Sequence, residues 1–233
     1  MEIKTLASGS GGNCYHIADG ETRLLIECGI PVAKIKKGLN FQLSKVSGCL
    51  ISHSHKDHSG SAKNITDSGI DILATKETLS SCGIKRGKEI KPLATYEVGS
   101  FLILPFETQH DCVGSVGFLI KSRITKEKLL FATDTFYIKY KFKNLTHIMI
   151  ECNYIETILK ENLEKGIVNY SQAKRLLESH MSLENLKGFL SANDLHLVEE
   201  IHLLHLSKKN SNSKKMKKEI EELTGKITII YGG

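Results

Sequence analysis

Tryptophan is absent from this chain of 233 residues, so its seven tyrosines and eight phenylalanines must supply the aromatic packing. No apolar run approaches the roughly 20 residues of a membrane-spanning helix, which argues against a membrane protein. No two of the six cysteines form a CxxC pair, and the start Met-Glu-Ile-Lys lacks the apolar core of a signal peptide. Cysteines in apolar surroundings behave as small hydrophobes, and together these features predict a protein of the reducing cytoplasm.

The chain also lacks internal repeats and any Pro- or Ser-rich linker. Its length fits one large α/β domain or two small ones, and its 40% hydrophobic and 25% charged residues are typical of a globular protein. A formal net charge of +6 can attract phosphate-bearing partners, or it can simply be a solvated lysine-rich surface. Much of this charge lies in three clusters: Lys34, Lys36 and Lys37; Lys85, Arg86, Lys88 and Lys91; and Lys208, Lys209, Lys214, Lys215, Lys217 and Lys218.

Hydrophobic spacing predicts short strands in the first two thirds of the chain and helices mainly in the last third. Ile155–Glu164 and Ser171–Ser191 both have helical spacing, and Ile201–Leu206 is a strand candidate. Strands with interspersed helices, repeated twice along the chain, predict a layered α/β sandwich.

A histidine-rich loop is the most informative motif: Ser52-His53-Ser54-His55-Lys56-Asp57-His58. The pattern His-x-His-x-Asp-His directly follows the apolar strand Cys49-Leu50-Ile51. Imidazole nitrogens and a carboxylate suit zinc and its neighbours as ligands. All these groups cannot bind one ion with good geometry, so we expect His53 and His55 to reach one metal ion and Asp57 and His58 to reach another.

Two metal ions need further ligands, which should again lie where strands end. Three residues meet that condition: His110, Asp134 and His205. Asp134 is the best candidate for a bridging ligand, because a carboxylate has two oxygens to share. Four other histidines lack this context and are interpreted as structural or surface residues: His16, His147, His196 and His202.

The histidine loop resembles the signature of the metallo-β-lactamase superfamily. The closer similarity is to its phosphodiesterase branch, which includes tRNase Z and the YycJ/WalJ-type hydrolases. The opening looks like the YycJ-type N-terminus: Leu6-Ala7-Ser8-Gly9-Ser10-Gly11-Gly12-Asn13-Cys14-Tyr15. The resemblance extends to His205-Leu206-Ser207, and it implies a single metallo-β-lactamase-fold domain over residues 1–233, a four-layer αββα sandwich.

The resemblance also implies a ligand set for two divalent cations. The first ion would be held by His53, His55 and His110, the second by Asp57, His58 and His205, and Asp134 would bridge them. A histidine-rich set suits zinc, and its carboxylates also permit manganese.

His180, in Ser179-His180-Met181-Ser182, resembles the His-Met-Thr/Ser element of tRNase Z, where the histidine faces the scissile phosphate without binding metal. Glu151 matches the carboxylate that orients this histidine. The implied catalytic residues are therefore Asp57 as proton acceptor, His180 as acid and Glu151 as its support. Glu27 departs from the family, which usually has Asp there, and its extra methylene is expected to alter the loop geometry. No long insertion resembles the arm with which tRNase Z grips tRNA, which argues against tRNA processing.

A general acid favours phosphodiester substrates, because their alkoxide leaving groups are poor. The sequence thus predicts a dinuclear metal-dependent nuclease acting on DNA or RNA. One alternative is a phosphodiesterase for cyclic nucleotides, with a closed pocket that a homodimer partner would complete. Another is a thioester or lactone hydrolase of the glyoxalase type. A non-enzymatic binding module is disfavoured, because no expected ligand position is vacant.

Overall fold

The computed structural model describes residues 1–232, which divide into two compact units. The first unit comprises Met1–Glu107 and Cys112–Glu127, and the second comprises Thr108–Asp111 and the chain from Lys128 onward. The expectation of one domain over residues 1–233 stays a prediction. Among the described residues, no helix is both long and apolar enough to cross a membrane.

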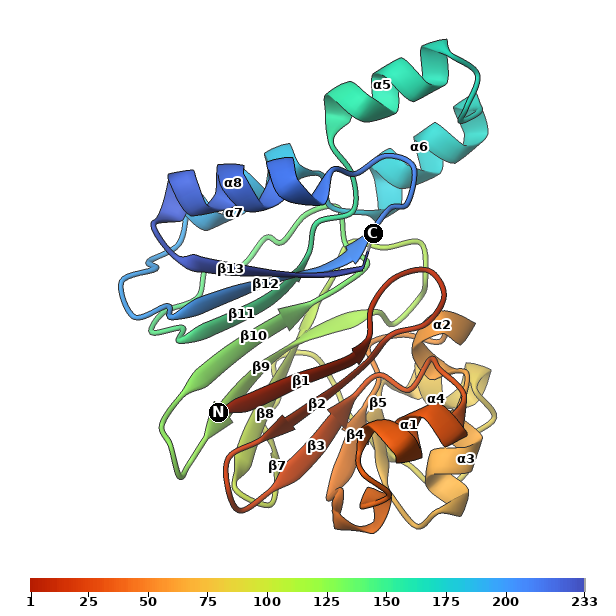
Figure 1. The fold of residues 1–233 in the computed structure, drawn as a ribbon. Helices are drawn as coiled ribbons and strands as arrows, with labels where there is room; N and C mark the ends of the chain where they lie inside the picture. The colour runs from red at the N-terminus through yellow and green to blue at the C-terminus, as the bar shows by residue number, and fades with distance from the viewer. Residues whose placement is uncertain (233) are drawn as a thin grey trace. The chain divides into compact units, whose positions relative to one another are not determined.

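The first unit contains a six-stranded sheet in the order β1-β2-β3-β4-β5-β6. Strands β1 to β3 pair antiparallel and β3 to β6 pair parallel. Their bounds are Glu2–Ala7, Cys14–Ala18, Arg23–Ile26, Gly48–Leu50, Ile72–Ala74 and Lys88–Glu89. The helices of this unit are α1 (Val32–Gly38), the 3-10 turn η1 (Leu43–Lys45), α2 (Lys56–Ser59), α3 (Ala62–Asp67) and α4 (Lys76–Ser81). Figure 1 shows α1, α3 and α4 beside this sheet, and their apolar residues share one core with strands β3 to β5.

An antiparallel meander completes the first unit. It consists of β7 (Tyr96–Val98), β8 (Phe101–Glu107) and β9 (Val116–Ser122). Buried and partly exposed residues alternate along most of β8, as expected for a strand with one face in a core.

Four parallel strands form the sheet of the second unit, in the order β13-β12-β11-β10. They are β10 (Lys128–Ala132), β11 (His147–Glu151), β12 (Glu200–Leu206) and β13 (Ile227–Gly232). Every residue of β11 is buried, which is typical of a parallel strand covered on both faces. The helices are α5 (Glu156–Glu164), α6 (Tyr170–Ser179), α7 (Leu183–Ser191) and α8 (Ser213–Thr224), of which α7 and α8 lie side by side in Figure 1.

The predicted α/β class is confirmed, but one helix prediction is wrong. Helical spacing predicts a continuous helix over Ser171–Ser191, whereas the chain forms α6 and α7 with a break between them. His180 has an extended backbone at the end of α6, and Ser182 begins α7 by accepting a hydrogen bond from the Asn185 amide. A serine that caps a helix competes with helix continuation, and periodicity alone does not detect this.

Candidate metal centre

The histidine loop of the first unit begins where β4 ends and continues into α2. Its backbone is fixed by Ser59, whose hydroxyl donates to the carbonyls of Ser54 at 2.9 Å and His55 at 3.1 Å. His53 is 1% exposed, and its Nδ1 lies 2.9 Å from the Ser52 hydroxyl. The opposite ring nitrogen, Nε2, lies 3.0 Å from Nδ1 of His55. The two histidines therefore point one nitrogen each toward a common position.

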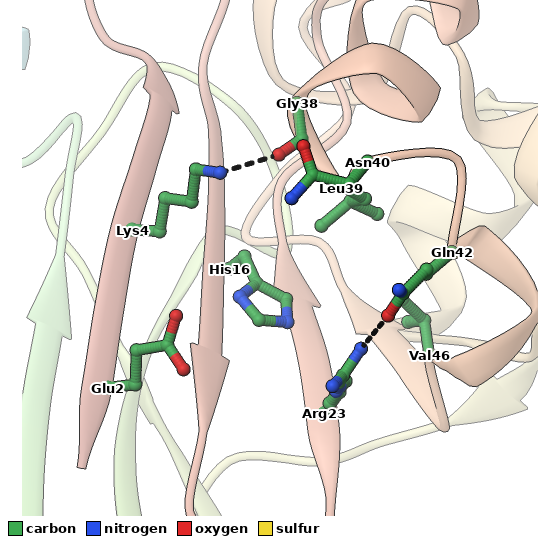
Figure 2. Close-up of a pocket in the computed structure, with 9 residues that line it drawn as sticks. All are labelled: Glu2, Lys4, His16, Arg23, Gly38, Leu39, Asn40, Gln42 and Val46. Carbon is green, nitrogen blue, oxygen red and sulfur yellow. Dashed lines mark hydrogen bonds between the residues drawn. The ribbon is translucent and has the colours of Figure 1, made fainter.

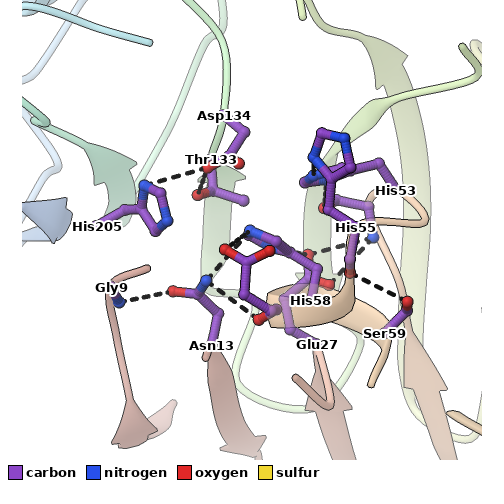
Figure 3. Close-up of polar contacts among 12 residues, drawn as sticks. Gly9, Asn13, Glu27, His53, His55, His58, Ser59, Thr133, Asp134 and His205 are labelled. Carbon is purple, nitrogen blue, oxygen red and sulfur yellow. Dashed lines mark hydrogen bonds and ion pairs between the residues drawn. The ribbon is translucent and has the colours of Figure 1, made fainter. Parts of the chain in front are cut away.

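Asn13 holds the other half of this loop (Figure 3). Its backbone amide donates to the Asp57 carbonyl at 2.7 Å, and its side-chain amide lies 3.1 Å from Nε2 of His58. The same His58 nitrogen lies 3.4 Å from the Asp57 carboxylate. Asn13 is fully buried and ends the glycine-rich turn, so that turn serves to place an amide against Asp57 and His58.

Glu27 lies beneath the loop with its carboxylate fully buried. It accepts a hydrogen bond from the Ser52 amide at 3.2 Å and lies 3.7 Å from Nδ1 of His58. Burial raises the pKa of Glu27, although contacts with His58 and Ser52 oppose that rise. Glu27 thus contacts the base of the loop, as the shorter aspartate of the family was expected to do. Its backbone is left-handed, with φ 63°.

Gly29 supplies the closest backbone approach to the loop, and we predict that alanine is not tolerated there. A Cβ at Gly29 would lie 1.7 Å from the Asp57 carbonyl oxygen and 2.6 Å from the His58 amide nitrogen. Gly29→Ala should therefore displace this peptide and reduce stability by about 3 kcal/mol, at the upper end of typical overpacking costs. Urea unfolding measures this change, and metal content should fall with it.

Gly11→Ala is the matched control, because a Cβ there meets no described atom within 4 Å. It should change stability by less than about 0.5 kcal/mol. Equal effects of the two substitutions would contradict the steric explanation.

In the second unit, Asp134 lies between two histidines. Its Oδ2 is 3.8 Å from Nε2 of His110, and its Oδ1 is 3.3 Å from Nδ1 of His205. The Thr133 hydroxyl donates to Oδ1 at 3.0 Å and fixes the carboxylate. Each oxygen of Asp134 therefore faces a different imidazole.

Parallel strand order explains why these side chains meet. Asp134 follows β10, Glu151 ends β11 and His205 lies near the end of β12. These strands are neighbours in register, so their carboxyl ends share one edge of the sheet. Asp134 and His205 adopt φ angles of 49° and 55°, a left-handed backbone that turns their side chains at this edge.

Both ring nitrogens of His110 have oxygen neighbours. Nδ1 lies 3.1 Å from the Ser179 carbonyl oxygen, and Nε2 lies 3.1 Å from the Asp111 carboxylate. When Nδ1 donates to the carbonyl of Ser179, a neutral ring keeps its lone pair on Nε2. Burial lowers the pKa of His110, against the charges of Asp134 and Asp111. A neutral imidazole with one oriented lone pair is the form that binds metal ions.

Glu151 holds both His180 and His205. One of its oxygens lies 2.7 Å from Nδ1 of His180 and 3.0 Å from Nδ1 of His205. Its other oxygen accepts the backbone amides of Thr135 and Met181 at 3.2 and 3.1 Å. Burial acts to raise the pKa of Glu151, but the charge and hydrogen bonds of the histidines outweigh burial and lower it.

The pKa of His180 shifts in the opposite direction to that of Glu151. Burial favours a neutral ring, yet the Glu151 carboxylate outweighs burial and raises the pKa of His180. Its ring stacks on His205 at 5.5 Å between centroids. Ligand atoms of Asp134, Glu151, His180 and His205 all lie within 4.8 Å of one another. The break between α6 and α7 is thus the feature that brings His180 to the sheet edge.

The remaining histidines lie elsewhere in their units. His16, on β2, is buried in a shallow pocket with Glu2, Lys4 and Arg23 (Figure 2). His196 is exposed beside Asp194, and His202 stacks on Tyr231. Sequence reasoning missed Asn13, whose only signal was its position at the end of a glycine-rich turn.

Comparisons with known proteins agree with the predicted family. The metallo-beta-lactamase superfamily model matches residues 7–78. Exodeoxyribonuclease WalJ of Streptococcus pneumoniae is 26% identical over 91% of this chain and 83% of its own length. Exodeoxyribonuclease YycJ of Bacillus anthracis is 24% identical over 91% of this chain and 84% of its own length.

Solved structures agree with the predicted fold. The metallo-beta-lactamase fold protein YhfI from Bacillus subtilis has a TM-score of 0.75 at 16% identity, over 99% of this chain and 95% of its own. The short form of human tRNase Z has a TM-score of 0.64 at 12% identity, over 99% and 95%. At these identities the likeness shows the fold alone, and the predicted metallo-β-lactamase fold is confirmed.

The ligand atoms present in the structure are of the kinds that bind divalent metal ions. Imidazole nitrogens and carboxylate oxygens make up the clusters of both units, and these His/Asp clusters suit two divalent metal ions.

Proposed function

We propose that this chain, which carries a metallo-β-lactamase domain and is homologous to the WalJ and YycJ exodeoxyribonucleases, is a metal-dependent exodeoxyribonuclease. The observation that supports this proposal best is the alignment with both named exodeoxyribonucleases over 91% of the chain. The His180–Glu151 pair supports it independently, because an acid is most useful when an alkoxide must leave.

The proposed metal centre uses seven side chains. His53, His55 and His110 hold one ion, Asp57, His58 and His205 hold the other, and Asp134 bridges them. The convergence of the His53 and His55 nitrogens supports the first set. The contact of each Asp134 oxygen with a different histidine supports the bridging role.

Two divalent cations at this centre would lower the pKa of a bound water and stabilise charge on the phosphate oxygens. Asp57 accepts a proton from the attacking water in our proposal. His180 donates a proton to the leaving 3′ or 5′ oxygen from Nε2, because Nδ1 is engaged by Glu151 at 2.7 Å. Glu151 is a positioning residue that keeps this ring protonated and correctly turned.

The proposal also includes the identity of the metal, the cellular compartment and the oligomeric state. Zinc is the favoured metal because histidines dominate the set, with manganese as the alternative. The six cysteines are free, which supports a reducing cytoplasm. A homodimer is required only by the cyclic-nucleotide alternative, which needs a closed pocket.

A substrate panel tests this function. Protein reloaded with zinc or manganese after chelation should release nucleotides from linear DNA and leave covalently closed circular DNA intact. RNA, cyclic nucleotides and a thioester should react more slowly, and a chelator should abolish activity. Faster turnover of cyclic nucleotides would favour the small-substrate phosphodiesterase, and turnover of the thioester alone would favour the glyoxalase type. A protein that takes up no metal ion would contradict all three of these metal-dependent functions.

A further inference from the structure

An aromatic–lysine segment, residues 136–143, begins two residues after Asp134 in the chain. Its sequence is Phe136-Tyr137-Ile138-Lys139-Tyr140-Lys141-Phe142-Lys143. The side chains alternate in exposure: Tyr137, Lys139 and Lys141 face solvent, whereas Ile138 and Phe142 are buried. Tyr137 is 55% exposed. The segment therefore exposes an aromatic ring and positive charges close together in the chain.

Two asparagines hold this segment against α7. The side-chain amide of Asn185 donates to the Phe136 carbonyl at 3.1 Å. The Asn193 side-chain oxygen accepts the Phe142 amide at 2.8 Å. The Tyr137 carbonyl also accepts a hydrogen bond from the Thr135 hydroxyl at 2.8 Å. The segment is thus anchored at both ends, so a ligand need not order it.

A groove of about 200 Å³ lies between the segment and α7. Tyr137, Lys139 and Lys141 line one side, and Gly188 lies in the α7 side. A glycine within a helix is unfavourable, and a Cβ at Gly188 would meet no described atom within 4 Å. Packing against the described residues therefore does not require glycine there, and the small residue leaves the α7 side of the groove open.

The charge in the groove favours an anionic ligand. Lys139 and Lys141 are exposed, and Glu184 is the acidic residue in the lining. The Glu184 carboxylate accepts the Glu156 amide at 3.3 Å, so it is directed toward the start of α5. The Lys139 ammonium group lies over the Tyr140 ring, 5.3 Å from its centroid, so this charge stays beside an aromatic ring. On α8, Lys217 and Lys218 lie 3.7 Å from the carboxylates of Glu221 and Glu222, one turn away.

We infer that this groove binds a single-stranded segment of the DNA substrate, with a base stacked on Tyr137 and phosphates beside Lys139 and Lys141. The inference rests on the proposed nuclease function. Aromatic rings interleaved with basic residues bind single strands, because every base has a face to stack and every linkage has a charge. Duplex DNA keeps its bases stacked inside and cannot use Tyr137.

The absence of tryptophan provides a direct test. Tyr137→Trp introduces a single indole whose fluorescence should be quenched by a single-stranded deoxyoligonucleotide and much less by the same sequence as a duplex. The titration is done in chelator, so that no cleavage occurs. Unchanged fluorescence at saturating single strand would overturn the inference, whereas failure of the nuclease proposal would appear separately, as a lack of DNA hydrolysis by the metal-loaded wild type.

Binding variants complete the test. Tyr137→Ala should weaken single-strand binding about tenfold, within the range for one stacked base.

The lysines are tested as two matched sets of three. Replacing Lys139, Lys141 and Lys143 together with glutamine should reduce the salt dependence of binding, whereas the same change at Lys214, Lys217 and Lys218 should not. Gly188→Leu should weaken binding without lowering the unfolding temperature. Equal effects of the two lysine triples would contradict the assignment of the groove.

Discussion

His180→Ala is expected to slow hydrolysis of DNA by roughly 100- to 10,000-fold, the usual contribution of a general acid. The reason is its geometry: Nδ1 of His180 lies 2.7 Å from the buried Glu151 carboxylate, which leaves Nε2 to donate. Hydrolysis of bis-p-nitrophenyl phosphate should fall far less, because p-nitrophenolate leaves without being protonated. The ratio of the two losses is the measurement that identifies an acid.

His196→Ala serves as the control, because His196 is exposed and its contact is with Asp194. It should leave both rates unchanged. Metal content of the His180 variant, measured by mass spectrometry, should equal that of the wild type. Equal losses with the two substrates would remove the acid role, and loss of metal would instead make His180 part of the metal centre.

The second large effect is expected at Asp134. Asp134→Asn keeps the shape of the side chain and tolerates the left-handed backbone of φ 49°, since asparagine adopts that conformation readily. It replaces one carboxylate oxygen with an NH₂ group, so it cannot bridge two ions. We expect metal content to fall by at least one ion per chain and turnover to fall on the order of 1,000-fold, for several kcal/mol of lost charge stabilisation.

Thr133→Val is the companion variant for this experiment. It removes the hydroxyl that donates to Asp134 at 3.0 Å but retains the carboxylate. A loss of roughly 10- to 100-fold in metal affinity is typical for such a supporting contact. An Asp134→Asn protein with full metal content would contradict the bridging role.

The sequence predicted the parts of the site that depend on strand ends. A ligand motif directly after a short apolar strand needs no long-range information, so the loop from His53 to His58 could be recognised as a unit. Asp134 and His205 could be chosen because each lies where a predicted strand ends. The structure shows that these strands are parallel neighbours of β11, and the two side chains lie 3.3 Å apart. The assignment of His110 and His205 to particular ions came from the resemblance alone, and the whole ligand assignment stays a prediction.

Features that depend on tertiary contacts were not accessible from the pattern. The spacing of Ser171–Ser191 fits one helix, and only the capping contact of Ser182 and the burial of Glu151 explain why the chain breaks at His180. The role of Asn13 was not predicted, because its contacts join residues 44 and 45 positions apart. The lysine clusters left two interpretations open for a related reason: charge counts do not show that Lys217 and Lys218 of α8 lie beside glutamates.

Three non-glycine residues of the proposed centre have left-handed backbone angles that glycine would adopt more easily: Glu27, Asp134 and His205. Each such residue costs about 1 kcal/mol or more. Folding therefore tolerates a conformational penalty at three positions of the proposed centre, as it does at other non-glycine positions such as Phe41 and Leu93. A search for more stable variants could select glycine at these sites and would lose the centre, so thermal stability alone is a misleading guide when this enzyme is engineered.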